Sequence, residues 1–371
     1  MKVLHVHKLK GVSGSEGHLL ALLPALRAAG IDARFLGLDV PGTDAPRFYE
    51  RLDELGVPHR SVRCGPDVSP RLARDVVRAV RAEHPDLLHT HLVHADVYGA
   101  VAAAATRTLH VSTRHNDDRY LLGPFRFLDR GFARGARRLI AISDAVRAFL
   151  EAAGHDPAKL VTIRYGLDAI PSAASEPTPE QAGIPSGAPL ALAVGRLIEQ
   201  KDHGTLLRAF ALVRVGLPEA RLAILGSGPL EAETRALIDS LGLTGAVVLP
   251  GRTEIRDWLE RADVFVHTAR WEGFGIVLLE AMLAALPVVA TSVSAIPEVV
   301  ADGETGILVA EGDVDGVARA LGELLEDPVR ARRLGIAGRD RALREFSVAR
   351  MADRTAEVYR DALLGSGGGR T

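Results

Sequence analysis

The feature that most limits the fold of this chain is a repeated alternation of short apolar runs with amphipathic helical segments. In the first half, the expected strands are 2–7, 33–38, 87–91, 110–113 and 139–143. Helical segments such as 18–29 and 72–83 lie between them. Strands that alternate with helices are joined by crossover connections, so this order predicts a parallel sheet with helices on both faces.

A stretch at 169–189, AIPSAASEPTPEQAGIPSGAP, contains five prolines and is expected to be a linker between two domains. The alternation then restarts, with expected strands at 190–194, 220–225, 246–249, 264–268, 287–291 and 306–309. The expected helices are 202–215, 229–241, 275–286 and 313–326. We therefore predict two doubly wound α/β domains, 1–168 and 190–346, that face a central cleft, with a final helix in 347–371 that packs back on the first domain.

Composition narrows the functional classes. The whole chain has 45 Lys and Arg against 47 Asp and Glu, a net charge of −2, which argues against nucleic-acid binding. Cys64 is the single cysteine, so nothing requires an oxidising compartment. The N-terminus is too short and polar for a signal peptide, and the longest apolar stretch, 276–290, is shorter than the ~20 residues of a membrane span. A cytoplasmic location is expected.

Two segments of the first domain follow expected strands and are candidates for ligand contact. The loop KLKGVSGSEGHLL carries Gly11, Gly14 and Gly17 before a helix, which favours an anion, although the spacing is not the GxGxxG of dinucleotide sites. His91 lies at the carboxyl end of a strand, where parallel sheets bind ligands. The sequence has no HExxH or comparable helical pair, so we expect a hydrogen-bonding histidine and no metal.

In the second domain, Gly195 ends a strand, Arg196 follows it, and Lys201 precedes a helix. Lys201 is the only lysine after residue 159. The planar guanidinium of Arg196 and the ammonium of Lys201, at the end of one strand, are suited to binding a diphosphate. The alternative for Lys201 is an ordinary solvated cation.

The segment ADVFVHTARWEGFGIVLLEAM contains the largest number of candidate functional residues. The amides of Phe274, Gly275 and Ile276 open a helix and form an expected anion seat. Glu272 and Glu280 lie eight residues apart at the same place. Two carboxylates beside a diphosphate are not suited to binding its phosphate groups. They are suited to accepting hydrogen bonds from hydroxyl groups of a sugar and a ribose.

With these motifs the sequence resembles the retaining glycosyltransferases of family 4, the group-1 glycosyl transferases, which have the GT-B fold of two Rossmann-like domains. The carrying elements are the pair Glu272 and Glu280 in EGFGIVLLEAM and the GR…K element from Gly195 to Lys201. Supporting elements are RYGLD at 164–168, LGSGP with Gly226, and LPGR with Arg252.

The resemblance implies a nucleotide-diphosphate sugar as donor, bound mainly to the second domain without a metal or other cofactor. It implies that Arg196 and Lys201 neutralise the departing diphosphate and that Glu280 holds the ribose hydroxyls. Glu272, with the amides of Phe274 and Gly275, would bind the transferred sugar.

From the first domain, the resemblance implies that His91 contacts the donor sugar and that Gly14 lies against the diphosphate. The first loop departs from the commoner Gly-Gly pair by reading GVSG. Gly226 and Arg252 are expected to contribute to donor binding from the second domain.

Several alternatives remain open. Paired carboxylates also serve glycoside hydrolases, which have no need of Arg196 and Lys201. A nucleotide-sugar epimerase or a non-catalytic nucleotide- or sugar-binding protein would share the architecture. UDP is favoured over GDP as the donor nucleotide, and the acceptor is a hydroxyl group of a lipid, a glycan or a small molecule.

A peripheral membrane contact is a separate hypothesis for the first domain, whose charge of +5 contrasts with −7 for residues 169–371. Arginines recur at helical spacing between Arg126 and Arg138, interleaved with phenylalanine and leucine. Such a segment could approach anionic lipid. The alternative is an amphipathic helix whose apolar face packs on the sheet.

Overall fold

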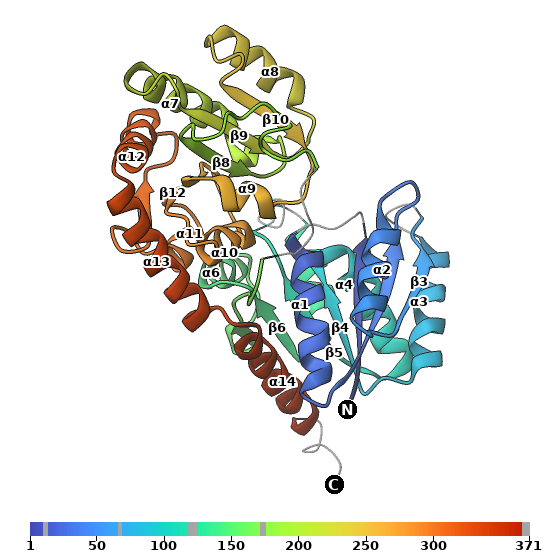
Figure 1. The fold of residues 1–371 in the computed structure, drawn as a ribbon. Coiled ribbons are helices and arrows are strands. Elements are labelled where there is room, and N and C mark those ends of the chain that lie inside the picture. Colours follow the sequence, from blue (N-terminus) through green and yellow to red (C-terminus); the bar gives the residue numbers. More distant parts are fainter. Residues whose placement is uncertain (10–13, 66–68, 118–122, 124, 171–175, 366–371) are drawn as a thin grey trace. The chain divides into compact units, whose positions relative to one another are not determined.

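The computed structural model describes residues 1–9, 14–65, 69–117, 123, 125–170 and 176–365, which fall into two compact units. Unit 1 comprises residues 1–166 together with 347–371, and unit 2 comprises residues 167–346. In each unit the described strands form one parallel sheet, and the units are coloured along the chain in Figure 1. The final helix therefore belongs to unit 1.

In unit 1 the sheet has the order β3-β2-β1-β4-β5-β6-β7. Its strands are β1 (Lys2–Leu9), β2 (Asp32–Asp39), β3 (His59–Arg63), β4 (Leu87–His91), β5 (Leu109–Arg114), β6 (Arg138–Ala141) and β7 (Leu160–Thr162). Its helices are α1 (Gly14–Ala28), α2 (Ala45–Glu54), α3 (Pro70–Glu83), α4 (Leu92–Thr106), α5 (Arg126–Ala133), α6 (Asp144–Ala152) and α14 (Val348–Leu364).

Two apolar clusters cover opposite faces of this sheet, as expected from the alternation of side chains along a strand. Val3 and Leu9 of β1 pack with α1, α2 and α14, whereas Leu4 and Val6 pack with α3 and α4. Helix α14 begins at an N-cap, Ser347, whose Oγ accepts a hydrogen bond from the amide of Arg350. The closeness of α1 and α14 in Figure 1 thus reflects a shared core.

Gly166 fixes the place where the chain meets the start of α14. A Cβ atom on Gly166 would lie 2.4 Å from the carbonyl oxygen of Ser347, which is backbone and cannot turn aside. We expect Gly166→Ala to lower the free energy of unfolding by about 2 kcal/mol, because overpacked backbone has to move. Urea unfolding at pH 7.5 measures the change.

The matched control for that substitution is Gly131→Ala, since Gly131 lies inside α5 and a Cβ added there would have no other atom within 4 Å. There the exchange should leave stability unchanged or raise it slightly, because alanine favours a helix. Equal unfolding free energies for both variants would mean that Gly166 is not needed for close approach.

In unit 2 the sheet order is β10-β9-β8-β11-β12-β13. Its strands are β8 (Leu190–Val194), β9 (Arg221–Leu225), β10 (Val247–Gly251), β11 (Val264–His267), β12 (Val288–Thr291) and β13 (Gly306–Val309). Its helices are α7 (His203–Gly216), α8 (Glu231–Ser240), α9 (Arg256–Arg261), α10 (Ile276–Leu283), α11 (Ile296–Val299), α12 (Val314–Glu326) and α13 (Pro328–Glu345).

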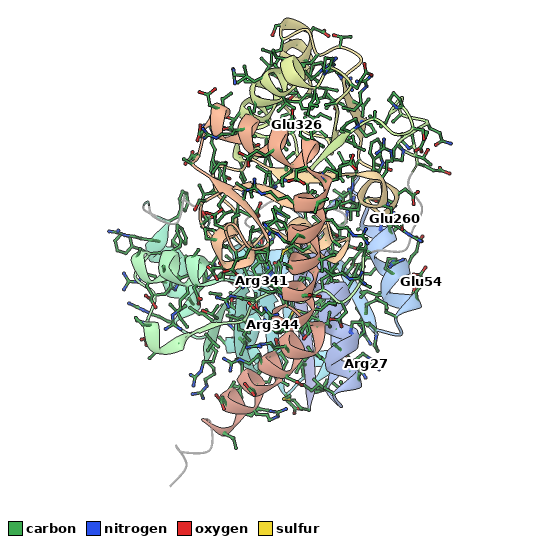
Figure 2. All side chains as sticks on the ribbon, turned by 60° about the vertical axis from the view of Figure 1, so that its left-hand side comes forward. Arg27, Glu54, Glu260, Glu326, Arg341 and Arg344 are labelled. Carbon is green, nitrogen blue, oxygen red and sulfur yellow. The ribbon has the colours of Figure 1, made fainter. Side chains whose placement is uncertain are left out.

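Helix α13 is held on unit 2 by close backbone packing and by Arg341. A Cβ on Gly335 would lie 1.9 Å from the carbonyl oxygen of Ala285, so only glycine fits there. Arg341, labelled in Figure 2, donates to the carbonyl oxygens of Val299 (3.0 Å) and Glu298 (3.0 Å) at the end of α11. These bonds satisfy carbonyl groups at the end of the short helix α11, which have no donor within the helix.

The structure differs from the sequence-based expectation in strands, in helices and in the linker. Strands β3 and β7 were not expected, because β3 is a polar edge strand and β7 has only three residues. Helices α2, α9, α11 and α13 were also not expected. The described part of the expected linker belongs to unit 2, where Ile184 is buried and Arg261 donates to the carbonyl oxygens of Pro185 and Ala188.

Candidate functional site

Both sheets reverse their strand order at one point, and several of the expected ligand residues follow the strands at these two points. The reversal falls between β8 and β11 in unit 2 and between β1 and β4 in unit 1. In open parallel sheets, ligands bind outside the carboxyl ends of the strands at such reversals. Gly195 follows β8 and Glu272 follows β11, so the sheet itself brings these two motifs together.

An ion pair between Lys201 and Glu272 forms the centre of the site in unit 2. Lys201 Nζ donates to Glu272 Oε2, and both side chains are 14% exposed. His267 Nε2 lies 3.1 Å from the same oxygen. One carboxylate oxygen therefore accepts from both an ammonium group and an imidazole.

Backbone contacts hold the two loops that carry this pair. Thr268 Oγ1 donates to the carbonyl oxygens of Lys201 (3.2 Å) and Asp202 (3.1 Å). Gln200 Nε2 donates to the carbonyl oxygen of Trp271 at 2.9 Å. The positions of Lys201 and Glu272 are thus set by their neighbours as well as by their own charges.

The charge states of the pair follow from burial and from these partners. Burial alone would raise the pKa of Glu272, but the Lys201 charge and the His267 hydrogen bond outweigh it and lower this pKa to about 2. Burial, followed by the charge of Lys201, lowers the pKa of His267. At neutral pH Glu272 is ionised and His267 is neutral, so His267 donates its Nε2 proton to the carboxylate.

Glycines let the loop that follows β9 come close to the loop that follows β8. A Cβ on Gly226, after β9, would lie 2.0 Å from the carbonyl oxygen of Gly195. A Cβ on Gly228 would lie 2.3 Å from that of Leu197. At Gly195 itself a Cβ would lie 3.2 Å from the Lys201 side chain. The predicted donor-binding glycines Gly195 and Gly226 therefore pack against each other and leave room for Lys201.

Helix α10 begins beside Glu272. Gly275 is its N-cap, with φ +83°, and makes no side-chain cap hydrogen bond. A Cβ there would lie 3.3 Å from Glu272 Cγ. The amino end of α10, with Phe274 buried behind it and Ile276 as its first residue, presents a positive dipole end next to the ion pair. The predicted anion seat would lie at this helix end, and anion binding there stays a prediction.

Glu280, Arg196 and Arg252 complete the set of predicted residues in unit 2. Glu280 is half-buried in α10, where burial and the nearby Glu254 raise its pKa to about 7. Arg196 is exposed, and its guanidinium makes no ion pair within the part of the chain that the structure describes. Arg252 is exposed after the end of β10. The hydrogen bonds and ion pairs of the Lys201–Glu272 pair with described residues do not include these three side chains.

Sequence reasoning missed His267, Thr268 and Gln200 as parts of this site. His267 and Thr268 read as the end of a strand, and Gln200 as a loop residue next to Lys201. The available signal was position alone, because His267 is the last residue of β11 at the strand reversal.

In unit 1, the strand reversal gathers histidines on one face of the sheet. His5 pairs in register with His89, and His7 with His91. All four are fully buried. Gly14 opens α1, while residues 10–13 of the predicted phosphate loop, Gly11 included, lie outside the described residues.

His91 is hydrogen-bonded at both ring nitrogens. Its Nε2 lies 3.0 Å from His5 Nδ1, and its Nδ1 lies 3.0 Å from His115 Nε2. On the far side of His115, Nδ1 meets the hydroxyl of Tyr165. A sugar hydroxyl could reach a ring nitrogen of His91 only by replacing one of these bonds, so the predicted sugar contact of His91 stays a prediction.

The bonds continue in the other direction through α14. His5 Nε2 lies 3.3 Å from the hydroxyl of Tyr359, which lies 2.6 Å from His89 Nδ1. His89 Nε2 lies 2.7 Å from Thr113 Oγ1. These seven groups form one hydrogen-bonded series, which we call the imidazole chain: Tyr165, His115, His91, His5, Tyr359, His89 and Thr113.

The hydrogen bonds of the imidazole chain must all run in one direction. Each neutral imidazole supplies one donor and one acceptor, and so does each hydroxyl, so the protons point the same way along the whole series. Burial lowers the pKa of His5 to about 3 and those of His89, His91 and His115 well below the usual range, which keeps the rings neutral. The tautomer of His91 is therefore coupled to those of its neighbours.

Three of these histidines could in principle hold a metal ion. One ring nitrogen from each of His5, His89 and His91 lies within 4.8 Å of the others. All six of their nitrogens already have hydrogen-bond partners, so an ion could bind only by replacing some of these bonds. The expected absence of a metal stays a prediction.

Comparison with known proteins agrees with this architecture. The family described as glycosyl transferases group 1 matches residues 175–341, and glycosyltransferase family 4 matches residues 12–169. Alpha-maltose-1-phosphate synthase of Mycolicibacterium smegmatis is 32% identical over 94% of this chain and 95% of its own. Phosphatidyl-myo-inositol mannosyltransferase of Mycobacterium leprae is 29% identical over 93% of this chain and 92% of its own.

Among solved structures, HepE of Anabaena, in complex with UDP and glucose, has a TM-score of 0.83 at 24% identity, covering 97% of this chain and 100% of that one. Sucrose-phosphate synthase of Thermosynechococcus elongatus has a TM-score of 0.79 at 22% identity, covering 98% and 100%. The predicted fold of two Rossmann-like parallel-sheet domains is confirmed. The protein is a glycosyltransferase. It belongs to family 4 of these enzymes, as its sequence motifs predicted.

Proposed function

We propose that this protein transfers a hexose from a nucleoside diphosphate sugar to an acceptor hydroxyl, with retention of configuration and without a metal ion. The observation that supports this most is the Lys201–Glu272 pair at the strand reversal of unit 2, beside the amino end of α10. Arg196 makes no ion pair in the described chain and adds a second cation after β8, the strand that Lys201 also follows. This arrangement offers positive charge to a diphosphate and a carboxylate to sugar hydroxyls.

In the proposed reaction, the bond from the sugar C1 to the diphosphate oxygen breaks, and the acceptor oxygen bonds to C1 on the same face. The acceptor proton passes to an oxygen of the departing phosphate. Lys201 and Arg196 stabilise the negative charge that develops on the leaving group, which is a preorganised electrostatic effect. Glu272 orients the sugar, and Glu280 binds the ribose hydroxyls.

UDP is the favoured nucleotide in this proposal. HepE, with a matching fold, was solved with UDP and with UDP-glucose. Another family member that matches part of this chain is named as a GDP-mannose-dependent enzyme, so GDP remains the competing donor. We further propose a cytoplasmic location, since the one cysteine, Cys64, is free and buried.

Thermal unfolding with UDP, GDP and ADP, each with magnesium or with EDTA, tests the donor and the metal together. A ligand at ~100 times its Kd stabilises the folded protein by ~2.7 kcal/mol, enough to raise Tm measurably. We expect UDP to raise Tm equally with magnesium and with EDTA. A shift that EDTA abolishes would contradict the metal-free site, and a shift with GDP alone would reassign the donor.

A second proposal concerns the acceptor side: unit 1 contacts an anionic membrane through α5. Phe125, Phe127 and Leu128 are 61%, 62% and 61% exposed, whereas Asp129 on the same helix is buried against Arg114 and His155. The apolar face of α5 therefore points to solvent. The relative of 29% identity from Mycobacterium leprae carries phosphatidyl-myo-inositol, a lipid, in its name. Among the described residues, no helix has both the length and the apolar character needed to cross a membrane.

Vesicle co-sedimentation at low salt tests this contact. We expect binding to vesicles with 30% phosphatidylglycerol, and at least a tenfold loss of partitioning in Phe125→Ser/Phe127→Ser, because each phenylalanine contributes about 2 kcal/mol when it leaves water. Val215→Ser is the control, since Val215 is 83% exposed on α7 of unit 2. Equal binding of all three proteins would rule out insertion through α5.

A further inference from the structure

A hollow lined by basic residues lies at the amino-terminal edge of the sheet in unit 1, where β5, β6 and β7 begin. Its volume is about 530 Å³. Five of its lining residues are cationic: Arg107, Arg134, Arg137, Arg138 and Lys159. The edge is opposite the carboxyl ends that carry His91, so this basic hollow is separate from the proposed donor and sugar contacts of unit 1.

The cations of the basic hollow have no acidic partners in the described chain. No carboxylate lines the hollow, and none of the five makes an ion pair with a described residue. The carboxylate nearest in sequence, Asp156, accepts a hydrogen bond from the amide of Ala158. Many arginines elsewhere in the chain do pair with carboxylates, as Arg147 does with Glu151. Like charges gathered without counter-charges favour the binding of an anion.

Lys159 is held in place before any ligand arrives. Its Nζ donates to the carbonyl oxygens of Arg134 at 2.8 Å and Ala136 at 3.0 Å, which leaves one of its three protons without an acceptor among the described residues. Arg138 Nη1 donates to the carbonyl oxygen of Arg137 at 3.1 Å. Arg107 and Arg137 are exposed, and their guanidinium groups make no hydrogen bond to a described residue.

We propose that the basic hollow binds the phosphate group of an anionic ligand, either a free phosphate compound or a lipid headgroup. Guanidinium groups match phosphate oxygens with two parallel hydrogen bonds, and a fixed ammonium adds a point charge. The volume exceeds that of one phosphate group, so a diphosphate or a substituted phosphate also fits. This site does not depend on the proposed transfer reaction.

A matched comparison isolates the hollow from the donor site, which also takes phosphates. The test variant is Arg107→Ala/Arg137→Ala. The control is Arg332→Ala/Arg333→Ala, which removes the same charge from exposed arginines of α13 that line another surface hollow, of about 550 Å³. Because all four arginines are exposed, both variants should fold, and equal Tm values verify this.

Inorganic pyrophosphate is titrated into each protein by calorimetry at low salt, and vesicles with 30% phosphatidylglycerol are used in parallel. We expect the test variant alone to lose at least a tenfold affinity, since charge-assisted hydrogen bonds to phosphate are lost. Loss with pyrophosphate only identifies a free phosphate ligand, and loss with vesicles identifies a headgroup. Equal affinities of test variant, control and parent for both probes, or no binding to either, would overturn the proposal.

Sugar transfer by the same variants separates this proposal from the proposed function. Neither pair of arginines lies among the residues that we assign to the donor or to the transferred sugar. A test variant that keeps the parent rate but loses pyrophosphate binding supports the hollow. Absence of transfer in the parent would count against the proposed function and leave the binding result unaffected.

Discussion

Lowering the pH from 7.5 to 5.5 should unfold unit 1 while unit 2 stays folded. Six histidines of unit 1, His5, His18, His89, His91, His110 and His115, have pKa values that burial lowers. In the unfolded chain a histidine has a pKa near 6.5, so below that pH the unfolded state binds protons that the folded state rejects. The stability that neutral burial supplies is present above pH 6.5 and is lost as the pH falls toward the folded pKa values.

The expected size of this effect is large. At pH 5.5 a histidine whose folded pKa lies far below that pH destabilises the folded state by about 1.4 kcal/mol. His5, His18, His89, His91 and His115 are such histidines, and together they contribute about 7 kcal/mol, which is comparable to the whole stability of a domain. In unit 2 only two histidines, His203 and His267, have lowered pKa values among the described residues. Glu280 acts in the opposite direction, because its folded pKa of about 7 lies above the unfolded value, so protonation stabilises the fold.

Hydrogen exchange measured by mass spectrometry at pH 7.5, 6.5 and 5.5, corrected for the intrinsic rate, assigns the loss to one unit. His18→Phe is the matched variant, since the His18 ring stacks on Tyr165 at 4.4 Å and its Nδ1 has no partner in the described chain. It should reduce the pH dependence by about one proton, or about 1.4 kcal/mol per pH unit. Simultaneous loss of both units, or protection of unit 1 down to pH 4, would contradict the prediction.

This behaviour could not be predicted from the sequence. The imidazole chain joins residues far apart in sequence, and it exists only because β1 and β4 pair with His5 opposite His89 and because α14 places Tyr359 between them. In the sequence, Tyr359 is one of several apolar positions of the final helix, and nothing marks it as a partner of histidines. A strand pattern predicts that His89 and His91 share a face, but strand register and helix docking decide what they touch.

By contrast, the centre of unit 2 was predictable because its residues lie close to strand ends. Lys201 and Glu272 follow β8 and β11, and a parallel sheet brings the carboxyl ends of neighbouring strands together. Helix α5 shows the limit of such reasoning. Its alternative as an ordinary amphipathic helix placed the apolar side inward, whereas the buried side carries Asp129 because Arg114 of β5 and His155 need a carboxylate there.

Replacing Lys201 with alanine should lower kcat/KM for sugar transfer by about 10³-fold, because the leaving diphosphate loses a preorganised cation. The same change should lower the free energy of unfolding by about 2–3 kcal/mol, because it leaves Glu272 as a buried carboxylate without its main counter-charge. Loss of the Lys201 charge lets burial dominate, so the pKa of Glu272 should rise from about 2. A loss of activity in this variant alone could therefore come from either cause.

The double variant Lys201→Ala/Glu272→Ala separates the two causes. Removing both charges abolishes the unpaired carboxylate, so its unfolding free energy in urea should recover most of what either single variant loses. Its kcat/KM should stay at least as low as that of Lys201→Ala, because neither the cation nor the sugar carboxylate is present. Lys201→Arg is the charge-preserving control and should keep more activity than Lys201→Ala. If the double variant regained activity together with stability, the ion pair would be structural, and the transfer chemistry would have to be sought elsewhere in the protein.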